Sequence, residues 1–179
     1  AADRAVAERI RERGGFDLVE AAYVKPAAEP PVRNDMLPAI EDAPPVTPHF
    51  TVNQLYLETA PGGIDARFAW TLAGGRGSDV RIIDVEGAWR FSHEDLTQNQ
   101  GGVVGGVPTQ DVKWRNHGTA VIGAIGGDAN TWGVTGIAPD ANVSAISIFG
   151  GLGSAAAIRM AADRLRPRDV LLVELHRPG

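Results

Sequence analysis

Three short apolar runs are the feature that most constrains how this chain can fold. They are VRIID at residues 80–84, NVSAISIF at 142–149 and DVLLVEL at 169–175. Each has the length of a strand and is almost wholly apolar, which is typical of strands buried on both faces. Helical patterns at 117–127 and 153–166 separate the runs, and Ser154 is expected to be the N-cap of the second helix. This alternation predicts an α/β fold with a parallel sheet flanked by helices on both faces.

Composition excludes several classes of function. The net charge is -5 and the 17 Lys and Arg residues are scattered, which argues against nucleic acid as the main partner. The absence of cysteine excludes disulfides, thiolate catalysis and cysteine-ligated zinc. There is no run of 18 apolar residues, so no membrane span is expected.

The pattern along the chain predicts three parts. Residues 1–25 are expected to form a helix that stops at Gly14-Gly15, followed by a strand. Residues 26–48 hold seven of the 12 prolines and are interpreted as an extended linker, or in their second half as an ordered arm on the surface. Residues 49–179 form the main domain, in which a helix at 63–70 is expected to bring Phe68 and Trp70 to the core.

Two residues of the main domain are candidates for acid–base chemistry. Asp84 ends the first apolar run, and His117 begins the helix that follows 33 residues later. Ligands of parallel sheets bind at the C-terminal ends of the strands, which is where Asp84 is expected. An Asp that accepts a hydrogen bond from one imidazole nitrogen leaves the other nitrogen free as a base. We therefore predict that Asp84 and His117 are hydrogen-bonded, although an Asp alone at a strand end is more often a turn or cap residue and a lone His is usually structural.

The text around these residues resembles the subtilisin-like serine proteases. The matching segments are RIIDVEGAWRFSHEDL, NHGTAVIGAIGG and GVTGIAPDANVSAISIF, within about residues 53–175. The corresponding family patterns are V-x-V-I-D-[TS]-G, H-x-D-L, H-G-T-x-V-A-G and G-V-A-P-x-A-x-[IL]. The resemblance implies a serine endopeptidase in which Asp84 is the triad acid and His117 the base, in the chain order known for subtilisin. The chain departs from these patterns at Val85, Glu86 and Ala120.

The nucleophile of such an enzyme is not recognisable in this chain. None of its five serines lies in the G-T-S-M-A-like context of the family: Ser78, Ser92, Ser144, Ser147 and Ser154. We therefore expect residues 49–179 to be the N-terminal half of a catalytic domain, with an incomplete sheet that a C-terminal chain completes. By the same resemblance, residues 1–25 are the tail of a propeptide, or else a simple helix–strand extension, and the protein is secreted.

The resemblance also implies binding residues. Gly153 and Ser154 would border the cleft for a protein or peptide substrate, and Leu175 would lie on its opposite wall. Asp95 and Asn130 match positions that bind structural calcium in many relatives, and oxygen donors from two loops suit that ion. The alternative is that Asp95 caps a turn and Asn130 adopts a left-handed loop conformation. No other cofactor is implied.

Two other functions are compatible with the same fold. The first is a non-catalytic folding or binding module of protease architecture. The second is nucleotide binding on a doubly wound sheet, but the only glycine-rich candidate, GGRG, precedes the first strand and so lies on the wrong side of it.

Overall fold

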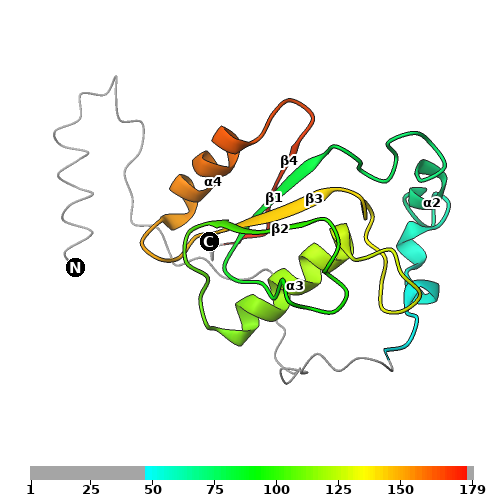
Figure 1. Cartoon of the computed structure of the whole chain (residues 1–179), viewed down its shortest axis with the longest axis horizontal. Coiled ribbons are helices and arrows are strands. Elements are labelled where there is room, and N and C mark those ends of the chain that lie inside the picture. Colours follow the sequence, from blue (N-terminus) through cyan, green and yellow to red (C-terminus); the bar gives the residue numbers. More distant parts are fainter. Residues whose placement is uncertain (1–46, 177–179) are drawn as a thin grey trace. The chain divides into compact units, whose positions relative to one another are not determined.

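The structure is a computed structural model that describes residues 47–176 (Figure 1). The helix and strand predicted within residues 1–25, and the linker up to residue 46, lie outside the described residues.

Four parallel strands form one sheet in the order β2-β3-β1-β4. The strands are β1 (Arg81–Glu86), β2 (Gln100–Gly105), β3 (Asn142–Ser147) and β4 (Val170–Val173). The predicted α/β class with a parallel sheet is confirmed, and β1, β3 and β4 are the three apolar runs. β1 and β3 are the inner strands, and β1 is buried from its second residue to its last.

Two long helices cover the two faces of this sheet (Figure 1). On one face lies α3 (Val112–Gly126), whose Ile122 joins a core with Ile82 and Val143. On the other lies α4 (Gly153–Arg164), which turns its fully buried Ala157 and Ala161 inward. Within the described residues, three short helices precede the sheet: η1 (Thr51–Asn53), η2 (Leu55–Leu57) and α2 (Ala66–Ala69).

Three helix predictions are wrong in detail. The predicted helix 63–70 is the single turn α2, and its Phe68 is 64% exposed rather than in the core. Ser154 lies inside α4, because the N-cap of that helix is Leu152. Helix α3 begins five residues before His117, because the carboxylate of Asp111 accepts a hydrogen bond from Lys113 N at 2.8 Å and so caps an earlier start.

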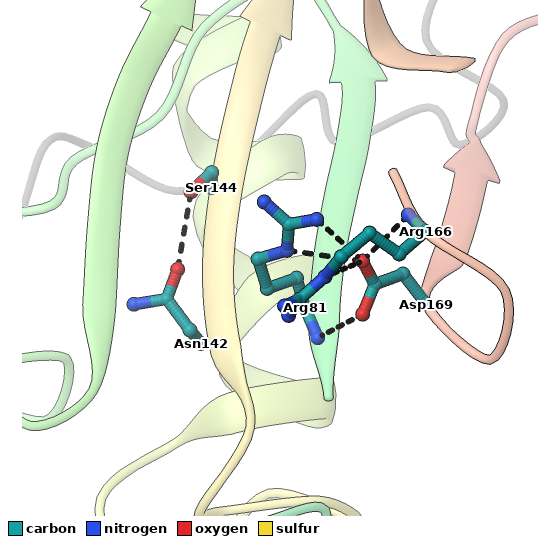
Figure 2. Close-up of polar contacts among 5 residues, drawn as sticks. All are labelled: Arg81, Asn142, Ser144, Arg166 and Asp169. Carbon is teal, nitrogen blue, oxygen red and sulfur yellow. Dashed lines mark hydrogen bonds and ion pairs between the residues drawn. The ribbon is translucent and has the colours of Figure 1, made fainter. Parts of the chain in front are cut away.

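Asp169 ties the beginning of β4 to the beginning of β1 (Figure 2). Its Oδ1 accepts a hydrogen bond from Arg81 N at 3.0 Å, and its Oδ2 accepts from Arg81 Nε at 3.0 Å and from Arg166 N at 2.8 Å. These donors, the two backbone N–H groups above all, lower the pKa of Asp169 to about 2. The carboxylate therefore stays charged over nearly the whole pH range and fixes β4 in register beside β1.

Replacing Asp169 by Asn should lower the melting temperature at pH 7, because the amide cannot accept all of these hydrogen bonds. Because the folded pKa lies below the ordinary 3.8, the contribution of the carboxylate is complete above pH 3.8 and is lost as the pH falls through about 2. Thermal unfolding at pH 7 measures the effect. The matched control is Asp163→Asn. The Asp163 side chain is 71% exposed, and its ion pair with Arg159 Nε is long, at 3.9 Å, so it should contribute little to stability. Equal melting temperatures for the two variants would contradict the role assigned to Asp169.

Candidate functional site

A histidine and a glutamate meet where β1 ends against α3. His117 lies in the second turn of α3 and is 6% exposed, and Glu86, the last residue of β1, is fully buried. His117 Nδ1 is hydrogen-bonded to Glu86 Oε1. Nε2 is therefore the ring nitrogen that remains for proton transfer.

Two glycines allow α3 to come this close to the end of β1. A Cβ on Gly118 would lie 2.3 Å from the carbonyl oxygen of Ala88 and 2.6 Å from Glu86 Oε2. A Cβ on Gly87 would lie 2.4 Å from two atoms of the Trp114 ring. Both positions therefore exclude any larger side chain, and the small residue after His117 is a requirement of the site geometry.

Asp84 has a different partner from the one predicted. It is fully buried on β1, and its Oδ2 accepts a hydrogen bond from Trp89 Nε1 at 2.7 Å, whereas its Oδ1 has no hydrogen-bond partner among the described residues. The predicted hydrogen bond between Asp84 and His117 is therefore wrong. The physical reason is length and register: Glu86 is two residues nearer the C-terminal end of the strand and has one more methylene with which to reach the imidazole.

Burial and hydrogen bonding shift three pKa values at this site. Burial raises the pKa of Asp84 to about 7, against the hydrogen bond from Trp89. Burial likewise raises the pKa of Glu86, while the bond to His117 opposes it. The hydrogen bond that His117 donates to Glu86 raises the pKa of His117, and burial of the ring lowers it. The site thus combines His117, whose environment favours the charged imidazolium, with Asp84, whose burial favours the neutral acid.

The sequence interpretation missed Glu86 and Glu174. The signal for Glu86 was available, because side chains alternate along a strand, so residues 84 and 86 face the same side. Glu174 directly follows β4, whose Val173 pairs with Val85, so it comes beside Glu86 in register. Its charge contributes to raising the pKa of Asp84, Glu86 and His117. The proximity of Glu174 to Glu86 depends on the pairing of β4 with β1, and the sequence alone does not reveal that strand order.

The residues expected to bind substrate lie at the ends of α4 and β4. Gly153 has φ 73° and begins α4, with Ser154 in the first turn. Leu175 is half-buried two residues after β4. A substrate role for these three residues stays a prediction. Of the serines, Ser147 is fully buried and donates to the carbonyl oxygen of Gly87 at 2.8 Å, which is a structural role.

Asp95 and Asn130 contact each other, which a shared calcium site would require. However, N–H groups of neighbouring residues are directed at the Asp95 carboxylate. Asn130 Nδ2 donates to Asp95 Oδ1 at 2.7 Å, and Val134 N donates to Asp95 Oδ2 at 2.7 Å. The amide oxygen of Asn130 accepts from Trp132 N at 2.9 Å, which fixes the orientation of that amide. Among residues 47–176 no three acidic, histidine or cysteine side chains gather as metal ligands. These residues therefore do not fit a calcium ion in this arrangement.

Comparison with known proteins places the sequence near the subtilisins. The chain is 33% identical to Subtilisin E of Bacillus subtilis (strain 168) and to Subtilisin NAT of Bacillus subtilis subsp. natto, in each case over 104 residues. It is 32% identical to Subtilisin amylosacchariticus of Bacillus subtilis subsp. amylosacchariticus over the same length. The matched segment is 55% of this chain but only 27% of each of these proteins. No protein-family model matches the chain.

Within residues 47–176, no helix combines the length and apolar composition needed to cross a bilayer.

Proposed function

We propose that this chain, which is subtilisin-like over part of its length, supplies the acid–base half of a serine endopeptidase. The observation that carries the proposal is the hydrogen bond between Glu86 and His117 at the C-terminal end of a central parallel strand. In this proposal Glu86, rather than Asp84, is the acid that orients the histidine. The subtilisin similarity supports the reaction class, which is hydrolysis of peptide bonds by a serine protease.

The proposed mechanism assigns one task to each of the two residues. Glu86 accepts a hydrogen bond from Nδ1–H, which fixes the tautomer and leaves Nε2 as the base. Nε2 takes the proton of a serine hydroxyl while that oxygen attacks the peptide carbonyl, and then gives the proton to the leaving amine. Glu86 stabilises the imidazolium formed in between, in keeping with the raised pKa of His117.

The serine belongs to a polypeptide that completes the domain. The sequence context of the five serines supports this part of the proposal, as does the partial coverage of the relatives. A propeptide role for residues 1–25, secretion of the protein, and substrate contacts by Gly153, Ser154 and Leu175 belong to the same proposal.

The proposal is tested by labelling with a fluorophosphonate, which reacts with activated serines, together with hydrolysis of casein. The 179-residue chain alone should neither label nor hydrolyse casein, because it has no activated nucleophile and lacks the main electrostatic contribution to catalysis. The chain extended by the residues that its gene encodes downstream should do both.

In the extended protein, His117→Ala should lower kcat by about 10⁴–10⁶-fold. The control His49→Ala, at an exposed position, should leave kcat unchanged. Stoichiometric labelling of the 179-residue chain would reveal a nucleophile within it and overturn the division of the triad. A downstream stop codon, or an extended protein that does not label, would favour the non-catalytic module.

A further inference from the structure

Asp84 is a buried ionisable group that the proposed mechanism does not use. It lies in the middle of β1, between β3 and β4, opposite Ala145 and Leu172. It is 0% exposed, and Trp89 Nε1 is its hydrogen-bond donor, at 2.7 Å from Oδ2. A fully buried carboxylate ordinarily needs several donors or a cation, so one indole N–H is weak support for a negative charge.

The groups around Asp84 make a second negative charge still less favourable. Glu86 lies two residues further on the same face of β1, and Glu174 follows β4 beside it. The titratable group that faces them from α3 is His117, which is already bonded to Glu86. Three carboxyl groups therefore lie near one imidazole, and Glu86 is the one that is hydrogen-bonded to it. Glu86 Oε2 is buried and, like Asp84 Oδ1, has no hydrogen-bond partner among residues 47–176.

We propose that Asp84 keeps its proton in the folded chain up to neutral pH and is a positioning residue for the Glu86–His117 pair. This inference rests on the proposed function, since it assigns Asp84 a task in tuning the same histidine. The proton resides on Oδ1, because Oδ2 accepts the hydrogen bond from Trp89. Neutral Asp84 leaves Glu86 as the one carboxylate on this strand that interacts directly with the imidazole.

A neutral Asp84 limits how far the pKa of His117 is raised. Each additional carboxylate nearby stabilises the imidazolium, and a base that is permanently protonated cannot accept a proton. Because Asp84 and His117 interact, each one's ionisation alters the pKa of the other, and their titrations are coupled. The pKa of about 7 for Asp84 puts this coupling in the neutral range.

Carboxyl-carbon NMR of the 179-residue chain tests the inference directly. The Asp84 Cγ resonance, assigned by its loss in Asp84→Asn, should titrate near pH 7 rather than near the ordinary 3.8. The midpoint itself is measured on the unmodified chain, and the variant serves only to assign the resonance. A midpoint near 4 would overturn the inference, because Asp84 would then be ionised throughout the neutral range.

The imidazole resonances of His117 provide the second measurement. They should titrate over a broadened, two-step range in the unmodified chain and in a single step with a lower midpoint in Asp84→Asn. The control Asp163→Asn, at an exposed site on α4, should leave the curve unchanged. Identical His117 curves with and without Asp84 would also overturn the inference. Neither measurement uses peptidase activity, so this inference and the proposed function can fail independently.

Discussion

Gly118→Ala should lower the free energy of unfolding by about 1–3 kcal/mol, while Gly123→Ala on the same helix should raise it by about 0.5–1 kcal/mol. The two glycines differ in their surroundings. An added Cβ at 118 would lie 2.3 Å from a backbone oxygen and 2.7 Å from Trp89 Cδ1, whereas one at 123 would have no neighbour within 4 Å. The first substitution forces α3 away from the end of β1, and the second only gains helix propensity.

Urea denaturation of the two variants measures this difference, and the Glu86–His117 contact adds a second readout. Displacing α3 should lengthen that hydrogen bond and lower the pKa of His117 in Gly118→Ala, but not in Gly123→Ala. Equal stabilities of the two variants would show that α3 does not approach β1 as closely as described.

Asp84→Asn should become progressively more stable than the unmodified chain as the pH rises, by about 2–3 kcal/mol between pH 5 and pH 8. The folded pKa of about 7 lies above the ordinary 3.8, so the folded state binds this proton more tightly than the unfolded state does. The stability that the neutral acid provides is therefore complete below pH 3.8 and is lost as the pH rises through about 7. Asn cannot ionise, so the variant does not incur this loss.

Urea denaturation at several pH values between 5 and 9 tests this expectation. The relevant quantity is the difference in unfolding free energy between the variant and the unmodified chain, which removes the contributions of all other groups. A difference that stays constant with pH would contradict the raised pKa. The control variant is Asp163→Asn, whose side chain is 71% exposed.

The sequence predicted the strands whose formation follows from their own local composition. The runs that became β1, β3 and β4 are apolar over the length of a strand, and burial in a parallel sheet demands that composition. Strand β2 was missed because its sequence, QGGVVG, is half glycine. Two of those glycines are required by residues distant in the sequence. A Cβ on Gly101 would lie 2.1 Å from Ser144 Oγ, and one on Gly105 would lie 2.4 Å from Met160 Sδ. Tertiary contacts override strand propensity at these positions.

The candidate site was predicted only in part, because some of its contacts join residues that are distant in the sequence. The sequence indicated the strand end and the histidine that the structure brings together, since both follow from position along the chain. It chose the acid by likeness to a motif, and the choice between Asp84 and Glu86 depends on how far each carboxylate reaches toward α3. Likewise, the N–H groups directed at Asp95 come from a loop more than 30 residues away, which no local pattern reveals.

The two acids of β1 also bear on how such a site can evolve. Positions 84 and 86 share a face and lie about 6.6–6.8 Å apart along the strand, whereas position 85 faces the opposite helix. An ancestral acid could therefore move along β1 only in steps of two residues. Each step can pass through a sequence that carries both acids, as this chain does, so no ancestor need lack a carboxylate on the face toward α3. Once the longer side chain holds the histidine, selection on the shorter one is free to favour its neutral form.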